Sequence, residues 1–462
     1  MPDDGGGPIA RRRATDRPPD GPGAFPLPLV VAGFGGLALV RVLPYLLGGP
    51  GFFVDDWRNL ARLDTVGWLR SAEASRFASR PGAWAVETVL YPVLRDHPVW
   101  WVIVLAALAT AVAAVLYLLL CRFTTPVVAL AVVTLWLLLP NHTSLRTFAN
   151  TAPMTVGLLL LVVSIVLMDD GRLVLGALVA AAGGLCYEVM LIPALGALVA
   201  IHLWRGEGTR RAASRAAGVV VVTGLLMLIH PTYRPGSAHR GSPAVIPAAH
   251  FASGLTPDPT IARILAATSV LGIGLGVARY AKGDREVGGG PWLIVCGLAT
   301  IALGVAAFAL KWPTEVRGQA DRSFVVSSVG AALAWVGIAR VLLERSRGAL
   351  GAAALALLVV LASANATYQR DWVESAQGAR QMLEGVQCRF GDEVPVDLGV
   401  GPQVPSPGGV RSLHQFFLAD ASRVTLGRPL TFDLVETEEA WRDRPANRQL
   451  TWDELIATRC DR

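Results

Sequence analysis

Two adjacent carboxylates, Asp55 and Asp56, lie in the stretch GGPGFFVDDWRNLARL, directly after the first long apolar run of the chain. A carboxylate within hydrogen-bonding reach of a hydroxyl can take its proton as a general base. Neighbours on a helix point about 100° apart, so one acid can face a cavity while the other caps the following helix. The alternative is a structural pair that caps an interfacial helix, with Trp57 and Trp68 anchored at the lipid headgroups.

A third acid, Glu188, lies in GLCYEVMLIPAL with almost no other polar residue nearby. A carboxylate in apolar surroundings costs free energy unless it has a partner. Glu188 is therefore a second candidate for chemistry, and the alternative is an acid that simply reaches interfacial water. Between two other apolar runs, Asn141, His142 and Arg146 form a polar stretch in which His142 is a possible ligand contact.

Three basic residues, Lys311, Arg317 and Arg322, follow one another closely in LKWPTEVRGQADRSF. A phosphate held by such a cluster gains charge-assisted hydrogen bonds. Lys311 is one of only two lysines among the 41 basic residues, the other being Lys282, so arginine is the usual cation of this chain. A single arginine therefore carries less information here than a cluster does.

The composition indicates a polytopic membrane protein. The chain has 462 residues, of which 53% are hydrophobic and 16% are charged, whereas soluble domains carry roughly 25% charged residues. The net charge of +6 has no clustered basic patch with interleaved aromatic residues, which argues against nucleic acid as a partner. No metal-binding spacing of Cys and His, no P-loop and no dinucleotide glycine fingerprint is present.

A helix needs about 20 apolar residues to cross a bilayer, and about eleven segments approach that length. They are 26–47, 98–120, 126–140, 152–168, 173–187, 189–204, 216–231, 260–281, 291–311, 323–343 and 349–367. As one helix, 173–204 would be about 48 Å long, too long for a membrane. As two short helices broken at 183–188, it places Arg205, Arg210, Arg211 and Arg215 on the same side as Arg11, Arg12 and Arg13, in agreement with the positive-inside rule.

This parity predicts the domain organisation. Residues 1–25 form a disordered cytoplasmic tail, and 26–367 form the transmembrane domain, with 48–97 as a long outer loop. Residues 368–462 form a small extracytoplasmic α+β domain, because they mix polar and apolar residues and contain the β-like runs EVPVDLGV and RVTLGRPLTFDLV. Cys388 and Cys460 both lie in that domain, where they either pair or remain free thiols. The fold class is thus all-α in the membrane, with an α+β domain outside.

Four motifs together resemble the GT-C-type membrane glycosyltransferases, which include protein O-mannosyltransferases, aminoarabinose transferases acting on lipid A, and bacterial arabinofuranosyl- and mannosyltransferases. They are VDDW after the first span, SRPGAWAVETVLYPVLRDHP before the second, GLCYEVMLIPAL at the tip of a helix pair, and ADRSFVVSSVG at the opening of a late span. The resemblance covers residues 26–367 and lies in the order and sidedness of the motifs. The late motif has Ser323 after Arg322, where the family usually has tyrosine.

The resemblance implies transfer of a hexose or pentose from a polyprenyl-phosphate donor to a glycan, lipid or protein acceptor at the outer face of the cell membrane, usually with inversion. Asp55 or Asp56 would be the general base and Glu188 a further catalytic acid, while Lys311, Arg317 and Arg322 would hold the donor phosphate. Arg80, Trp57, His142 and Arg146 are possible substrate contacts. A divalent cation at Asp55 and Asp56 is left open, as some relatives use one.

Two alternative functions belong to other classes. One is a transporter, or a polymerase of lipid-linked polysaccharide; the other is a non-catalytic protein of envelope assembly. A coupled carrier is expected to bury ionisable residues in mid-span, whereas the span arginines Arg41, Arg279 and Arg340 each lie near an end. The sugar and the acceptor are not encoded in any motif recognised here.

Overall fold

The structure is a computed structural model of the 462-residue chain. It describes residues 25–67, 80–205, 210–228, 242–306, 308, 316, 318–343, 346–391, 393–395, 398–401, 410, 413, 415, 418–435, 442 and 449–458. The expected cytoplasmic tail, Trp68, Lys311, Arg317 and Cys460 lie outside these residues.

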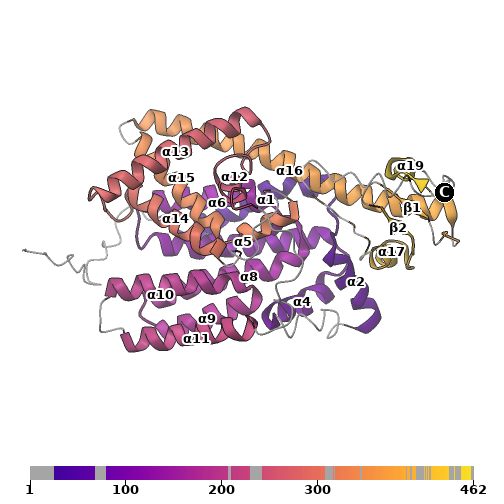
Figure 1. The fold of residues 1–462 in the computed structure, drawn as a ribbon, viewed down its shortest axis with the longest axis horizontal. Helices are drawn as coiled ribbons and strands as arrows, with labels where there is room; N and C mark the ends of the chain where they lie inside the picture. Colours follow the sequence, from indigo (N-terminus) through magenta and orange to yellow (C-terminus); the bar gives the residue numbers. More distant parts are fainter. Residues whose placement is uncertain are drawn as a thin grey trace, which may run out of the picture.

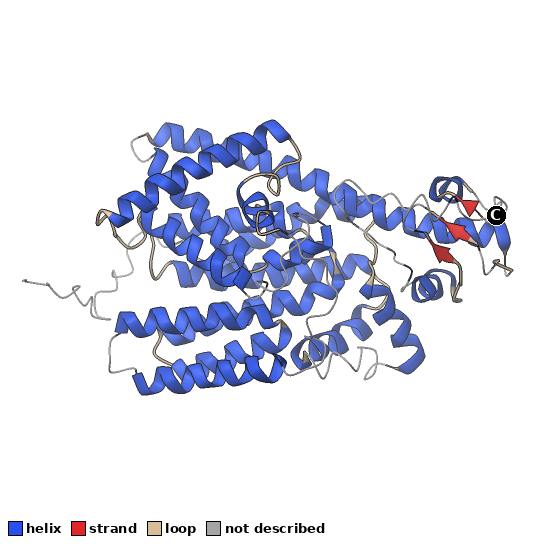
Figure 2. Ribbon diagram, viewed as in Figure 1, coloured by secondary structure: helices blue, strands red, loops and turns tan. Residues whose placement is uncertain are grey.

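A bundle of apolar helices forms the main body of the described structure (Figures 1 and 2). Its long members are α1 (Leu27–Gly48), α5 (Pro98–Leu120), α6 (Pro126–Leu138), α8 (Ala152–Asp169), α9 (Leu173–Cys186), α10 (Leu191–Arg205), α11 (Arg210–Leu228), α13 (Pro259–Ala281), α14 (Gly290–Ala306), α15 (Ser327–Leu343) and α16 (Arg347–Phe390). Each apolar segment proposed from the sequence is thus helical over most of its described residues. The segment 173–204 is indeed broken: α9 ends at Cys186, and the short helix η5 (Glu188–Met190) precedes α10.

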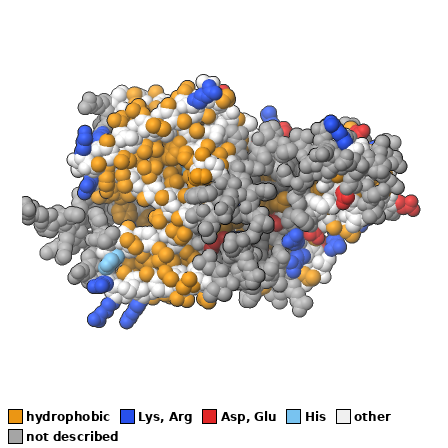
Figure 3. All heavy atoms as spheres, viewed as in Figure 1, with side chains coloured by type: hydrophobic (Ala, Val, Ile, Leu, Met, Phe, Trp, Pro, Cys, Tyr) orange, Lys and Arg blue, Asp and Glu red, His pale blue; other side chains and the backbone are white. Residues whose placement is uncertain are grey.

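Five of the described helices, α1, α5, α8 with the residues before it, α13 and α16, are long and apolar enough to cross a membrane. Five others, which belong to α6, α9, α10, α14 and α15, are apolar but shorter. Large apolar side chains cover much of the visible bundle surface (Figure 3), and Leu47 and Val270 are 79% and 74% exposed. Such a surface is compatible with a membrane protein and is unfavourable in water.

Close helix contacts in the bundle depend on small residues. A Cβ added to Gly297 of α14 would lie 2.6 Å from the carbonyl oxygen of Gly330 on α15, and a Cβ on Gly330 would lie 2.5 Å from that of Gly297. The two backbones therefore touch at this point. Between membrane helices, where no hydrophobic effect drives association, such close packing is a main source of stability.

The C-terminal region is built around one long helix. We expected the last span to end near residue 367, but α16 continues to Phe390, and its 44 residues would extend about 66 Å. Figure 1 shows its far half beyond the bundle, with α17 (Leu418–Leu426), α19 (Trp452–Ala457) and three short strands around it. The strands β1 (Gly399–Val400), β2 (Asp433–Leu434) and β3 (Gln449–Leu450) form a parallel sheet in the order β2-β1-β3.

This region is not separate from the first loop. The loop helices α2 (Asp55–Val66) and α4 (Pro81–Leu94) share one hydrophobic core with α16, α17 and the sheet. Trp57 of α2, Met382 of α16 and Leu418 of α17 all belong to it. Within the tail, Cys388 is disulfide-bonded. The C-terminal region therefore holds α2 in place.

Several short elements gather at the end of the bundle where α1 finishes. They are α2, α4, η3 (Pro140–His142), α7 (Ser144–Thr147), η4 (Ala149–Thr151), η5 and η8 (Gly318–Phe324), and we call this the loop end. Contacts join α7 with η8, η4 with α2, and α4 with α9. All site residues proposed from the sequence and described in the structure lie on elements of the loop end.

Candidate functional site

Asp56 is fully buried and fixed by three donors. The hydroxyl of Tyr91 and the backbone N–H of Asn150 donate to Oδ1 over 3.0 and 2.8 Å, and the N–H of Phe53 donates to Oδ2 over 3.2 Å. Burial raises the pKa of Asp56 to about 8, against the opposing effect of these hydrogen bonds. The bond from Phe53 N–H ties the residue before the N-cap Val54 to the first turn of α2. Asp56 thus joins α2, α4 and η4 and has little capacity left for a substrate.

Asp55 is arranged differently from its neighbour. Its side chain is only partly buried, and the amide of Asn150 donates to Oδ2 over 3.0 Å. It is the first residue of α2, and the N-cap position before it is taken by Val54, which makes no side-chain cap bond. The expected division into one capping and one accessible acid is therefore changed: Asp56 is a buried anchor, and Asp55 is the accessible carboxylate.

The backbone just before the two acids is strained. Val54 has φ 28°, ψ −99°, an arrangement that a β-branched residue rarely adopts. Such a residue costs about 1–3 kcal/mol and persists only where its surroundings hold it. The bonds from Phe53 to Asp56 provide this restraint, since Asp56 N–H also donates to the Phe53 carbonyl over 2.7 Å. The strained turn thereby determines the direction in which the side chain of Asp55 points.

Arg322, on η8, lies over the ring of Phe148. Its guanidinium lies 6.0 Å from the centre of the Phe148 ring, two residues before the Asn150 that contacts Asp55. The preceding Asp321 is buried and accepts hydrogen bonds from the N–H and the hydroxyl of Ser144. Residues 144–150 therefore connect η8 with the acids of α2. They bring Asp55 and Arg322 to the same short segment.

Glu188 is held by a different arginine. Arg80 Nη2 lies 2.6 Å from Glu188 Oε1, and the Arg80 guanidinium lies 5.3 Å from the centre of the Tyr187 ring. The other carboxylate oxygen of Glu188 is buried and has no hydrogen-bond partner among the described residues. Two residues proposed separately from the sequence, a catalytic acid and a substrate contact, thus form one ion pair.

Helix α4 relates this pair to the buried Asp56. Arg80 immediately precedes α4, and Tyr91, which binds Asp56, lies near its other end. Eleven residues of helix correspond to about 16 Å. Glu188 and Asp56 are therefore attached to opposite ends of one helix, and a single reacting atom does not contact both. Glu188 is a neighbour of the site around Asp55 and not a second acid at the same atom.

The polar stretch around residues 141–151 is buried, although the sequence suggested a ligand-facing turn. His142 is 0% and Arg146 1% exposed. Arg41 of α1 reaches this stretch from the bundle: its guanidinium donates to the carbonyls of Leu137 and Leu139 and lies 3.2 Å from His142 Nε2. Burial and the nearby Arg41, Arg146 and His250 lower the pKa of His142 well below its usual range, which favours the neutral imidazole.

The network continues through the bundle. The amide of Asn141 lies 2.6 Å from His250 Nδ1, and His250 Nε2 lies 2.9 Å from the hydroxyl of Ser327 on α15. His250 belongs to α12 (Val245–Phe251), which is absent from the sequence interpretation. These contacts connect η3, through His250, to α15 in the bundle. The side chains of this network are all buried, so they do not face solvent. We therefore interpret the network as one that positions the segment 141–151.

Trp57 is 7% exposed and packs edge-on against Phe52, with ring centres 5.6 Å apart. It faces the core shared with the C-terminal region, which differs from the expected contact with headgroups.

The described residues around Asp55 and Asp56 do not form a recognisable site for a divalent cation. No three His, Cys, Asp or Glu side chains converge among the residues that the structure describes. The oxygens of Asp56 are already occupied by donors, so no step is assigned to a metal.

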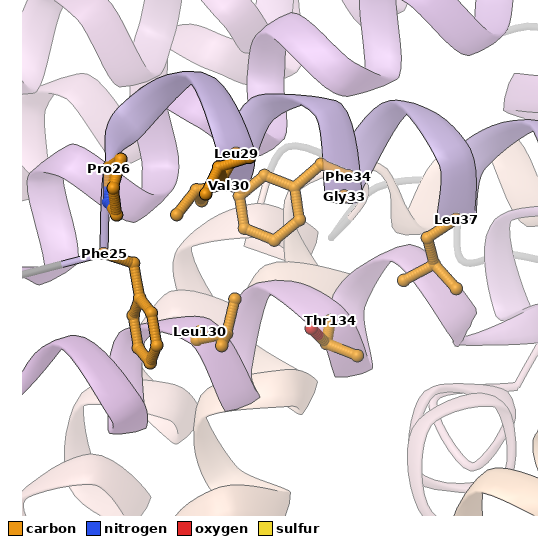
Figure 4. A pocket seen from close by; sticks show the side chains of 9 residues that line it. All are labelled: Phe25, Pro26, Leu29, Val30, Gly33, Phe34, Leu37, Leu130 and Thr134. Atoms are coloured by element: carbon orange, nitrogen blue, oxygen red, sulfur yellow. The ribbon is translucent and has the colours of Figure 1, made fainter.

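A groove lies elsewhere, between α1 and α6 (Figure 4). Its volume is about 410 Å³, and it is lined by Phe25, Pro26, Leu29, Val30, Gly33, Phe34, Leu37, Leu130 and Thr134. Thr134 supplies the only polar side chain of this lining. The groove lies along the first half of α1, whereas Asp55 comes after the end of that helix, so the two are far apart. The groove is therefore no part of the candidate site.

No protein-family model and no curated protein matches the chain. The family resemblance therefore stands on the four motifs alone. The sequence interpretation missed Tyr91, Asn150 and His250, which are buried partners of Asp56 and Asn141, and Asp321, which binds Ser144. Tyr91 had one detectable signal, because it lies eleven residues after Arg80 and so on the same face of a helix. The others had none, since their partners are distant in sequence.

Proposed function

We propose that the chain is an integral-membrane glycosyltransferase of the GT-C type, which transfers a sugar from a polyprenyl-phosphate donor to an envelope acceptor. The observation that carries the proposal is the accessible carboxylate of Asp55 at the start of the first loop, set by the strained Val54 and held by Asn150. Arg322 near Phe148 supports it, because a cation on the same segment suits a phosphate leaving group.

In the proposed reaction, Asp55 accepts the proton of an acceptor hydroxyl. The hydroxyl oxygen forms a bond to the anomeric carbon, whose bond to the donor phosphate oxygen breaks. The phosphate leaves with the electron pair, and Arg322 stabilises its charge. Attack from the side opposite the phosphate inverts the anomeric configuration. Lys311 and Arg317, which lie outside the described residues, are proposed to assist Arg322.

The test compares two isosteric variants in the purified full-length protein. We expect Asp55→Asn to lower transfer from polyprenyl-phosphate sugar by about 10²–10⁴-fold, the usual contribution of a general base, with an unchanged melting temperature. Asp56→Asn retains activity but loses about 1–3 kcal/mol of stability, since the amide nitrogen that replaces Oδ2 cannot accept from the Phe53 N–H. Full activity in both variants would contradict the mechanism and would favour the non-catalytic or transport alternatives.

The proposed orientation places the loop end and the C-terminal region on the outer face of the cell membrane and residues 1–25 in the cytoplasm. It rests on the charges at the opposite end of the bundle, where Arg122 pairs with Asp169 and Asp170 and where Lys282 and Arg285 lie. The eleven spans proposed from the sequence belong to the same proposal.

A further inference from the structure

Arg146 is a buried cation without a hydrogen-bonding partner. It is 1% exposed, and its Nε, Nη1 and Nη2 atoms have no acceptor among the described residues. A guanidinium carries five N–H donors in a planar fork. Buried polar groups are almost always hydrogen-bonded, and an exception indicates a partner of another kind, such as an ion or water.

The side chains around Arg146 do not supply this partner. Its guanidinium lies 5.1 Å from the centre of the Trp136 ring. His142, one turn earlier, stacks on the same indole with ring centres 5.6 Å apart and an angle of 8°. A cation–π contact stabilises a buried charge by less than the cost of leaving that charge without a hydrogen-bonded partner. The aromatic contact therefore offsets only part of the cost of burying Arg146.

The local charges are also unbalanced. Arg41, the other guanidinium of this network, contacts only neutral groups: three carbonyl-type oxygens and His142. Asp321 is close enough to attract Arg41, but its carboxylate accepts from Ser144. Asp321 thus acts on Arg41 but not on Arg146, and neither guanidinium makes a salt bridge among the described contacts. Burial and Arg41 both lower the pKa of Arg146, which means that the charged form lacks stabilisation.

We propose that Arg146 is the principal ligand of a buried oxyanion site beside Trp136 and His142, and that the ligand is a phosphate group. The planar fork of arginine matches two phosphate oxygens, and an anion there would balance the excess positive charge. His142 borders the site but is not a donor to the anion, because its Nε2 lies 3.2 Å from Arg41 Nη1 and its Nδ1 lies 3.2 Å from Asn141 Oδ1. The group is either free phosphate or the headgroup of a phosphate-bearing lipid, which offer the same oxygens.

The site is distinct from the surface around Arg322 and does not depend on glycosyl transfer. Arg146 lies four residues before Asn150, so an anion held there would stiffen the segment that contacts both Asp55 and Arg322. An occupied site would therefore order the candidate active site from its buried side. The free energy of unfolding would then also depend on the concentration of the anion.

The experiment measures thermal unfolding of the full-length protein in nanodiscs, in phosphate-free buffer, with chloride at matched ionic strength. One arm adds inorganic phosphate, and the other includes polyprenyl phosphate in the disc lipids. A ligand at 100 times its dissociation constant stabilises by about 2.7 kcal/mol. We expect the melting temperature to rise in one of the arms, and which arm responds identifies the source of the phosphate.

Three variants decide where the anion binds. Arg146→Met is expected to abolish the phosphate effect, and without phosphate it melts no lower than the wild type, because it removes an unpaired buried charge. Arg122→Gln is expected to keep the effect in both arms. Arg322→Met is expected to keep the effect of inorganic phosphate, whereas Arg322 is itself proposed to hold the lipid phosphate of the donor. A loss in Arg322→Met with retention in Arg146→Met would assign the anion to the surface and overturn the proposal. Absence of any phosphate effect in the wild type would overturn it as well.

If Arg146→Met fails to fold, the bound anion can be observed on the wild type alone. Native mass spectrometry of protein released from phosphate-containing discs should show one retained phosphate or phospholipid per chain. An unliganded mass would contradict the proposal. None of these measurements uses a sugar donor, so their failure leaves the proposed role of Asp55 untouched.

Discussion

At the scale of residues, the two adjacent aspartates show how far a motif can be interpreted alone. The pair itself, its place after α1 and its separation into two roles follow from sequence and helix geometry. The sequence favours Asp55 as the base only because Asp56 is nearer the following helix. The burial of Asp56 itself depends on Tyr91 and Asn150, which lie 35 and 94 residues from it. Burial of Asp56 is therefore a property of the tertiary structure and not of the motif.

Asp56 makes the stability of the protein depend on pH. Its pKa is about 8 in the folded state and near 4 when unperturbed, so the folded protein retains a proton that the unfolded chain releases within this window. The corresponding stability is fully present below about pH 4 and is lost as the pH rises to about 8, by at most about 1.4 kcal/mol per pH unit. We expect Asp56→Asn to flatten a plot of melting temperature against pH. A slope equal to that of the wild type would show that another group is responsible.

The ion pair between Arg80 and Glu188 is expected to contribute to the stability of the protein. Its side chains are 30% and 24% exposed, so a coupling of about 1 kcal/mol is expected. In a double-mutant cycle, Arg80→Met and Glu188→Gln should lower stability separately but not additively. Arg122 and Asp170, a pair at the opposite end of the bundle, provide the matched control. Additive stability losses would mean that Glu188 is held by something other than Arg80.

At the scale of elements, helix α4 depends on close contact with α9 through one glycine. A Cβ on Gly82 would lie 2.7 Å from the backbone nitrogen and 2.8 Å from the sulfur of Cys186. We expect Gly82→Ala to move α4 away, to cost about 1–3 kcal/mol as overpacking does, and to expose the buried Cys186 thiol to maleimide. Gly36→Ala is the control, because no atom lies within 4 Å of its added Cβ. Equal maleimide labelling in both variants would contradict the contact.

At the scale of the whole molecule, the sequence predicts where most helices lie along the chain, but not which elements pack against one another. Apolar runs mark every long helix of the bundle, because bilayer thickness and helix rise determine the run length. The boundary at residue 367 failed because residues 368–390 continue α16 as a helix with a polar face. The packing of the C-terminal region on α2 joins residues such as Trp57 and Leu418, whose separation in sequence hides the contact.

The proposed orientation gives the final prediction, which also decides whether Asp55 can meet a donor on the outer leaflet. With Cys121, Cys186 and Cys296 replaced, single cysteines are introduced at Val66 of α2 and at Glu286, which is exposed near the opposite end of the bundle. In intact cells, an impermeant maleimide should label Val66→Cys, and Glu286→Cys only after lysis. Arg122, Lys282 and Arg285 lie at the Glu286 end of the bundle, and short basic loops are retained in the cytoplasm. Labelling of Glu286→Cys in intact cells would place Asp55 and Arg322 in the cytoplasm, where the chemistry proposed here would need a donor on the inner leaflet.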